Sequence, residues 1–275
     1  MIGFFDSGSG GLTILNEVRK ALPSSDLLYL GDHARAPYGH RASADIVAYT
    51  KEGVARLYEE GADLVILACN TAAAIALRDM QQNWLASAWP GKRLLGVLVP
   101  MVETVTGLPW TDDTGATSGH SHHVMLFATQ RTIQSRAYRD EVMKRAPDIT
   151  LSQIACPGLV DAIEGGAPAL ALDGMVAGFV KDAVERCGVP DRVILGCTHF
   201  PLVQNLFQRH LGDGVQVFNQ PDIVARSLSD YLTRHHLKQS NEKGHLQLFT
   251  TASDPLSLDL KSLAADISAP SFKSI

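Results

Sequence analysis

One stretch of the chain occurs twice, and this repeat restricts the possible folds more than any other feature. The segment Asp-Leu-Val-Ile-Leu-Ala-Cys-Asn-Thr at 63–71 matches Asp-Arg-Val-Ile-Leu-Gly-Cys-Thr-His at 191–199. In each copy an apolar run of strand length ends in a small residue and a cysteine, which are Cys69 and Cys197. The repeat therefore predicts two similar units, each with a buried strand that carries a cysteine at its carboxyl end.

Around the repeats, apolar runs alternate with amphipathic stretches of helical period. The expected strands are 2–5, 27–30, 64–68, 94–99, 124–128, 149–154 and 193–196, and the expected helices are 12–22, 44–60, 132–145 and 174–187. This alternation is typical of an α/β fold with mainly parallel sheets, here in two pseudosymmetric doubly wound domains. We expect 1–99 with 207–275 to form the first domain and 100–206 the second, with the active site in the cleft between them.

The composition favours a protein that acts on a small molecule. The chain has 275 residues, of which 45% are hydrophobic, and a formal net charge of -5, so it has no basic surface suited to nucleic acid or to an anionic membrane. The first residues lack the pattern of a signal peptide, and no apolar run reaches membrane-spanning length. We therefore expect a soluble cytoplasmic protein whose four cysteines are thiols.

A polar segment at 108–123 contains His120, His122 and His123. A metal site is one interpretation of these histidines, but no acidic or cysteine partner shares their spacing. Solvated histidines of a surface loop are the favoured interpretation, and no metal is assigned.

Two similar domains that face each other would bring Cys69 and Cys197 to opposite walls of one cleft, which suits inversion at a carbon centre. One base must remove a proton from one face of the carbon while an acid returns a proton to the other face. A thiolate and a thiol meet this need, since a helix start or a cationic neighbour lowers a thiol pKa from about 8.5 toward neutrality. Cys156 and Cys187 have no counterpart in the repeat, so a structural role is favoured for them.

Five motifs carry a family resemblance. They are Phe-Asp-Ser-Gly-Ser-Gly-Gly-Leu at 5–12, Asp-His-Ala-Arg-Ala-Pro-Tyr-Gly at 32–39, Cys-Asn-Thr-Ala at 69–72, Ala-Thr-Gln-Arg-Thr-Ile at 128–133 and Gly-Cys-Thr-His-Phe-Pro-Leu at 196–202. Together they make nearly the whole chain similar to the glutamate racemases of the aspartate/glutamate racemase superfamily. The resemblance implies two α/β domains, no cofactor, and conversion of L-glutamate to D-glutamate for peptidoglycan synthesis in a bacterial cytoplasm. It leaves the oligomeric state open, with a homodimer as one option.

The same resemblance implies roles for individual residues. The acid/base pair would be Cys69 and Cys197, assisted by Asp6, Glu164 and His199. The substrate would be held by Asp6, Ser7, Tyr38, Gly39, Asn70, Thr71, Thr129, Thr198 and His199. Dipoles clustered at strand and helix ends suit this task, because they stabilise the negative charge that develops on the substrate.

Some positions depart from the usual family pattern, and each assigned residue has a structural alternative. The departures are His33, Ala73, Gln130, Arg131, Asn219 and Gln220. They leave open whether glutamate or another acidic substrate, such as aspartate, is preferred. The hydroxyl, amide and carboxylate residues could act only as helix caps, Tyr38-Gly39 as an ordinary turn, His199 as a structural histidine and Glu164 as a solvated residue.

Other classes of function fit the residues less well. The glycine turn at 8–13 imitates a dinucleotide-binding fingerprint but lacks its last glycine. A nucleophilic hydrolase that used Cys197 with His199 would leave the repeat at Cys69 unexplained, and catalytic pairs usually come from separate elements. A non-catalytic binding protein would have no use for the pair of cysteines.

Overall fold

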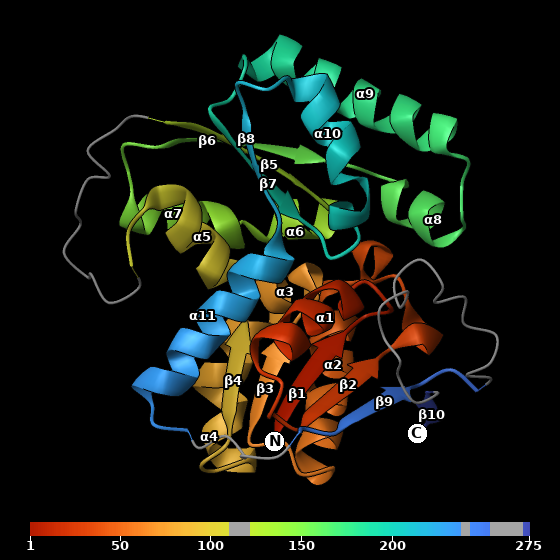
Figure 1. The fold of residues 1–275 in the computed structure, drawn as a ribbon, viewed down its shortest axis with the longest axis vertical. Coiled ribbons are helices and arrows are strands. Elements are labelled where there is room, and N and C mark those ends of the chain that lie inside the picture. The colour runs from red at the N-terminus through yellow and green to blue at the C-terminus, as the bar shows by residue number, and fades with distance from the viewer. Residues whose placement is uncertain (110–121, 238–242, 254–271) are drawn as a thin grey trace. The chain divides into compact units, whose positions relative to one another are not determined.

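The computed structural model describes residues 1–109, 122–237, 243–253 and 272–275. The chain divides into two compact units, unit 1 with residues 1–97 and 221–275 and unit 2 with residues 98–220. Each unit has its own parallel sheet with helices packed against it (Figure 1). The predicted fold class, two doubly wound α/β domains with parallel sheets, is confirmed.

Unit 1 contains a six-stranded sheet in the order β10-β9-β2-β1-β3-β4, and all neighbouring strands run parallel. Its strands are β1 (Ile2–Asp6), β2 (Leu27–Gly31), β3 (Leu64–Leu67), β4 (Arg93–Gly96), β9 (Leu246–Thr250) and β10 (Lys273–Ser274). Its helical segments are α1 (Leu12–Ala21), η1 (His33–Arg35), η2 (Tyr38–His40), α2 (Ser43–Glu59), α3 (Asn70–Asp79), η3 (Met80–Trp84), α4 (Leu85–Ala88) and α11 (Gln220–Arg234), whose first residue still belongs to unit 2. The central strands β1, β2 and β3 are buried along their whole length, as expected for parallel strands covered on both faces.

Unit 2 contains a four-stranded parallel sheet in the order β6-β5-β7-β8. Its strands are β5 (His123–Ala128), β6 (Thr150–Ala155), β7 (Arg192–Gly196) and β8 (Gln216–Phe218). Its helical segments are α5 (Leu98–Thr106), α6 (Gln130–Ser135), α7 (Ala137–Arg145), α8 (Leu159–Glu164), α9 (Ala169–Cys187), η4 (Phe200–Val203) and α10 (Gln204–Leu211). Figure 1 shows α9 and α10 together on one side of the strands, where Met125, Phe127 and Leu195 form a core with Val180 and Phe207.

The two sheets repeat one strand order. The segment β2-β1-β3-β4 of unit 1 has the same arrangement as β6-β5-β7-β8 of unit 2. In both, the second strand lies on one side of the first, and the third and fourth strands lie on the other side. The strand order therefore reverses between the first and third strands, and open α/β sheets bind ligands beside the carboxyl ends of the strands at such a reversal. The two repeated cysteines follow the third strands, β3 and β7.

The division between the units differs from the predicted boundary at 207. That position lies inside α10, which packs against α9. The next strand, β8, pairs with β7 through Val217 and Val193, so the chain stays with unit 2 up to residue 220. The first boundary, after 97, is close to the predicted one at 99, because the apolar run from Leu94 forms β4 and then the start of α5.

One further sequence prediction concerns the histidines of the polar segment at 108–123. His120 lies outside the described residues. His122 and His123 are described, and the ring of His123 bonds to Ser152 at 2.9 Å through Nε2. Within the described ranges, no group of three or more His, Cys, Asp or Glu side chains is placed to hold a metal ion.

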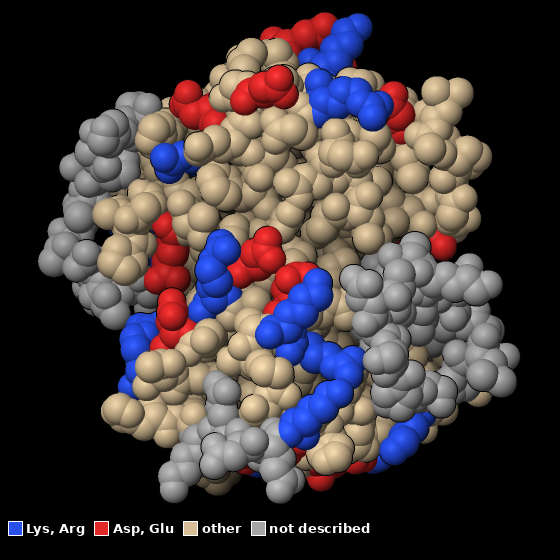
Figure 2. Space-filling model, in the orientation of Figure 1, with Lys and Arg blue, Asp and Glu red and all other residues tan. Residues whose placement is uncertain are grey.

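The surface carries charges of both signs. On the face drawn in Figure 2, lysine and arginine side chains are interspersed with aspartate and glutamate. Across the part of the chain that the structure describes, no helix combines the length and the apolar character needed to cross a bilayer.

Replacing Gly53 with alanine is expected to destabilise unit 1. A Cβ at this position of α2 would overlap the ring of Phe5, which is fully buried in β1. Overpacking of this kind costs about 1–3 kcal/mol, measurable as a lower denaturant midpoint. Gly178→Ala is the matched control, since Gly178 is an exposed helical glycine with no atom within 4 Å of the added methyl group. It should raise stability slightly, by up to about 1 kcal/mol, and equal effects of the two changes would contradict this packing argument.

Candidate active site

The first candidate group lies at the strand-order reversal of unit 1. Asp6 ends β1, and Cys69 follows β3, its direct neighbour in the sheet. Cys69 is 5% exposed, and its Sγ lies 3.4 Å from the Oγ of Ser7. The carboxyl ends of these two strands therefore bring together three of the predicted site residues.

Cys69 is the N-cap of α3. The backbone N–H of Ala72 donates to Sγ at 3.5 Å, and the next residues, Asn70 and Thr71, form the first turn and are buried. A helix N-terminus stabilises negative charge, so this position favours the thiolate form of Cys69. The cap is the cysteine itself, although sequence reasoning considered only Asn70 and Thr71 for that role.

The turn after β1 is fixed by polar contacts and by close packing. Asp6 is fully buried, and its Oδ1 accepts the N–H of Gly8 at 2.9 Å. The hydroxyl of Tyr29 donates to the carbonyl of Gly8 at 2.7 Å. A Cβ on Gly11 would lie 2.8 Å from the Cβ of Asp6, so only glycine allows α1 to start this close to the carboxylate. The N-cap of α1 is Gly11, and no side chain makes a capping hydrogen bond there. The alternative in which Asp6 or Ser7 caps that helix is therefore wrong.

Tyr38 and Gly39 lie in the short helix η2 that follows β2. Tyr38 is buried, and its hydroxyl donates to the carboxylate of Asp32. Burial and the neighbouring Asp32 charge raise the pKa of Tyr38 far above its usual value, so the phenol stays protonated. This turn is more than an ordinary surface turn, because its aromatic side chain is anchored in the interior of unit 1.

The second candidate group lies at the equivalent position of unit 2. Cys197 follows β7 and is 6% exposed, and its Sγ lies 3.9 Å from Nδ1 of His199. Nε2 of His199 lies 2.8 Å from Oε1 of Glu164 at the end of α8, which makes the two groups a close ion pair. The N–H of the ring does not point straight enough at this oxygen for a hydrogen bond. The contact identifies Glu164 as a partner of His199, although the Glu164 side chain remains 32% exposed to solvent.

The imidazole of His199 is held in its charged form. Burial lowers its pKa, but the contacts with Cys197 and Glu164 raise it by more, to about 10. At neutral pH an imidazolium therefore lies beside Cys197. A positive charge at this distance stabilises a thiolate, the form that acts as a base.

The pH dependence of stability should reveal this charged histidine. An unfolded histidine has a pKa near 6.5, so the contribution of His199 is complete below that pH and is lost as the pH rises through about 10. We expect the unfolding free energy to fall across pH 7–10 with a slope of up to about 1.4 kcal/mol per pH unit. Denaturant titrations of the wild type and of His199→Asn test this, since the variant should lack that part of the slope. A variant with the wild-type slope would contradict the assignment.

The threonines of unit 2 occupy the other predicted positions. Thr129 follows β5, and its hydroxyl accepts the N–H of Thr132 at 3.3 Å, which caps α6. Thr198, which lies between Cys197 and His199 in the sequence, is buried. The capping alternative therefore holds for Thr129, while β5 and β7 still place it beside the strand end that carries Cys197.

The departures from the family pattern lie around these groups. Ala73 is buried in the first turns of α3, and Arg131 on α6 bonds to Gln134 at 3.2 Å. Asn219 donates to Gln204, and Gln220 donates to the hydroxyl of Tyr138 at 3.5 Å. None of them replaces a predicted acid/base group, and the imidazole of His33 contacts Ser9 and Thr250.

Sequence reasoning missed Asp32 as a residue of this site. Its carboxylate is fully buried and binds Arg35 and Tyr38. The signal was available, because a carboxylate directly after a buried strand and inside a recognised motif needs partners. Arg35 and Tyr38 belong to the same motif as Asp32, whereas a third partner, Thr251, lies far away in the sequence and carries no such signal.

The chain matches known proteins over most of its length. The family model described as Asp/Glu/Hydantoin racemase matches residues 12–228. The glutamate racemase of Jannaschia sp. (strain CCS1) is 46% identical over 261 residues, 94% of each chain, and that of Paracoccus denitrificans is 46% identical over 254 residues, 92% of each. The crystal structure of Francisella tularensis glutamate racemase in complex with D-glutamate matches with a TM-score of 0.84 and 25% identity, covering 100% of this chain and 96% of the other. Fold, site and sequence agree, and this chain belongs to the Asp/Glu/Hydantoin racemase family.

Proposed function

We propose that this chain is a glutamate racemase that interconverts L- and D-glutamate without a cofactor, with Cys69 and Cys197 acting on opposite faces of the substrate α-carbon. The observation that carries the proposal is the duplicated placement of the two thiols. Each follows the third strand of its sheet, beside a group that stabilises a thiolate: the start of α3 for Cys69 and the imidazolium of His199 for Cys197. A structural cysteine would need neither neighbour.

The reaction needs only proton transfers. One thiolate takes the α-proton of glutamate and becomes a thiol, while the other thiol gives its proton to the opposite face of the α-carbon and becomes a thiolate. The enzyme then holds the protonation state that starts the reverse reaction. Asp6 assists at Cys69, and Glu164 with His199 assists at Cys197.

Substrate binding falls to the polar groups at the strand ends. We infer that Ser7, Tyr38, Gly39, Asn70 and Thr71 contribute from unit 1, and Thr129, Thr198 and His199 from unit 2. Hydroxyls, amides and backbone N–H groups at these ends can hold carboxylates and stabilise the charge that builds up at the α-carbon. Product D-glutamate would serve peptidoglycan synthesis in the cytoplasm, and a homodimer is the assembly we propose to test.

Incubation of the purified protein with each enantiomer of glutamate and of aspartate tests the substrate. Circular dichroism should show both glutamate solutions converge to zero ellipticity in buffer without added cofactor or metal, while the aspartate solutions change far more slowly. If aspartate is inverted rapidly and glutamate is not, the substrate is aspartate and the assignment of glutamate is wrong. If neither changes, the proposed racemase activity is wrong.

A further inference from the structure

The end of β9 reaches the site motifs of unit 1 from about 220 residues away in the sequence. Thr250 closes β9 and pairs with Gly31 at the end of β2. The N–H of Thr251 then donates to the carbonyl of Gly31 at 3.2 Å. Two consecutive hydroxyl side chains are thereby placed beside His33 and Asp32.

Thr251 binds the buried carboxylate of Asp32. Its hydroxyl donates to Oδ1 at 2.7 Å and also accepts the N–H of Ala34 at 3.1 Å. The same carboxylate accepts the Nε–H of Arg35, 2.8 Å from Oδ2 and 3.0 Å from Oδ1, and the hydroxyl of Tyr38. Asp32 thus joins β9 to both short helices, η1 and η2.

The opposite side of this loop is held by α2. The guanidinium of Arg35 lies over the ring of Tyr49, 4.1 Å from its centroid, and pairs with Glu52. The ring of Tyr38 packs between Tyr49 and Phe5, with centroid distances of 6.1 and 6.3 Å. The hydroxyl of Tyr38 is held by Asp32, and Arg35 and Thr251 both hold that carboxylate.

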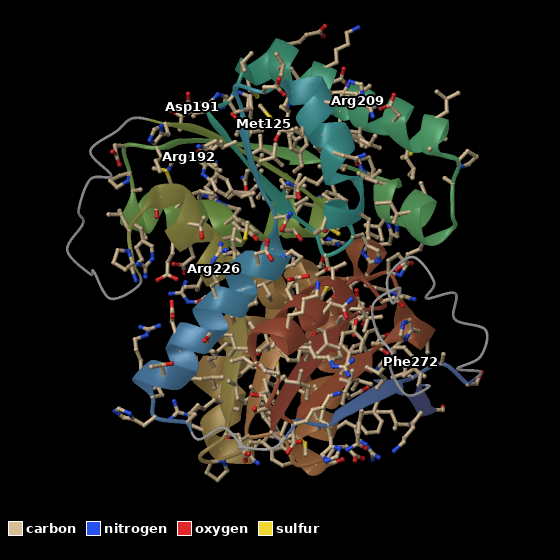
Figure 3. The ribbon with its side chains drawn as sticks, in the orientation of Figure 1. Met125, Asp191, Arg192, Arg209, Arg226 and Phe272 are labelled. Carbon is tan, nitrogen blue, oxygen red and sulfur yellow. The ribbon has the colours of Figure 1, made fainter. Side chains whose placement is uncertain are left out.

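His33 makes a parallel link to the turn after β1. Its Nε2 lies 2.8 Å from the Oγ of Ser9, and its Nδ1 lies 2.8 Å from the Oγ1 of Thr250. Phe272, labelled in Figure 3 where the chain enters β10, packs edge-on against this imidazole at 5.5 Å. The C-terminal strands therefore support both turns that carry predicted substrate-binding residues.

We propose that Thr251 is a positioning residue: by holding Asp32 it fixes the Tyr38-Gly39 turn, and through that turn it sets the affinity for the amino-acid substrate. The inference rests on the proposed function for the identity of the substrate. Thr251 itself touches neither cysteine in the structure's described contacts. Its effect is expected on binding, which the ground state and the transition state share.

Thr251→Val keeps the shape of the side chain and removes the hydroxyl. We expect KM for L- and D-glutamate to rise about tenfold, the factor that corresponds to about 1.4 kcal/mol, with kcat changed less than threefold. Thr251→Ser, which retains the hydroxyl, should have a KM close to that of the wild type. Thr106→Val is the matched control, because Thr106 is a buried threonine at the end of α5 whose hydroxyl bonds locally, donating to Val102 at 2.7 Å and accepting the N–H of Leu108 at 3.3 Å.

Hydrogen–deuterium exchange of the same proteins tests the positioning without using activity. Peptides covering 31–41 should take up deuterium faster in Thr251→Val than in the wild type, Thr251→Ser or Thr106→Val. Unchanged uptake and unchanged KM in Thr251→Val would overturn the inference, and so would a loss of activity that Thr251→Ser fails to restore. If the wild type does not invert glutamate, the proposed function fails, and the exchange rates still decide whether Thr251 holds this turn.

Discussion

Replacing either Cys69 or Cys197 with serine is expected to lower kcat/KM for glutamate inversion by at least about 10³-fold. A serine hydroxyl is far less acidic than a thiol, so it provides neither the thiolate that removes the α-proton nor an acid matched to its return. Both single variants should be nearly as inactive as the double variant, because each direction of the reaction uses both groups. Circular dichroism of glutamate solutions gives the rates.

Cys187→Ser is the matched control for these variants. Cys187 ends α9, is half-buried and has no counterpart in the repeat. This variant should keep wild-type kcat/KM and a similar unfolding midpoint. A Cys69→Ser or Cys197→Ser protein that keeps more than about a tenth of the wild-type rate would contradict the two-cysteine mechanism.

His199→Asn is expected to lower kcat/KM by about 10²–10³-fold. The variant removes the positive charge beside Cys197 and leaves the surroundings of Cys69 unchanged, because the described contacts of His199 lie within unit 2. The two enantiomers have equal free energies in water, so kcat/KM must fall equally in both directions. Glu164→Gln should act in the same direction with a smaller loss, since the Glu164 side chain is 32% exposed and supports the imidazolium from outside.

The kinetic isotope effect distinguishes which half of the reaction is impaired. With glutamate deuterated at the α-carbon, His199→Asn should show a larger primary isotope effect for one enantiomer only, the one from which Cys197 removes the proton. Asp6→Asn should show the larger effect for the other enantiomer. Equal increases for both enantiomers in His199→Asn would contradict a role restricted to Cys197.

The repeat and the strand pattern predict the fold class because buried parallel strands leave a strong signal in sequence. The runs at 2–5, 27–30 and 193–196 match β1, β2 and β7 to within a residue. The sequence predicts a helix at 174–187, but α9 begins at Ala169, since the small residues before Gly174 carry little amphipathic signal. β8 and β9 are short strands, and several of their residues are only partly buried. Which strands they pair with depends on tertiary contacts, and the periodicity of the sequence does not encode those contacts.

The site residues that belong to sequence motifs could be predicted. The contacts between residues far apart in the sequence could not. The pairing of His199 with Glu164 joins the residue before η4 to the end of α8, and no spacing in the sequence encodes the 2.8 Å contact. The link from Thr251 to Asp32 depends on β9 adding to the edge of β2. Cys69 as a helix cap follows from the backbone angle at the strand end, which residue type alone does not specify.

The central claim, inversion by two separate proton carriers, is tested most directly by isotope incorporation at early times. L-glutamate is incubated with wild-type protein in deuterated buffer, and the D-glutamate product and the remaining L-glutamate are then separated. Mass spectrometry measures the deuterium content of each enantiomer. The mechanism predicts that nearly every molecule of D-glutamate carries one solvent deuterium at the α-carbon while the remaining L-glutamate is still protiated. Product that retains the substrate proton would show that a single group removes and returns it, and would contradict the assignment of Cys69 and Cys197 as a pair.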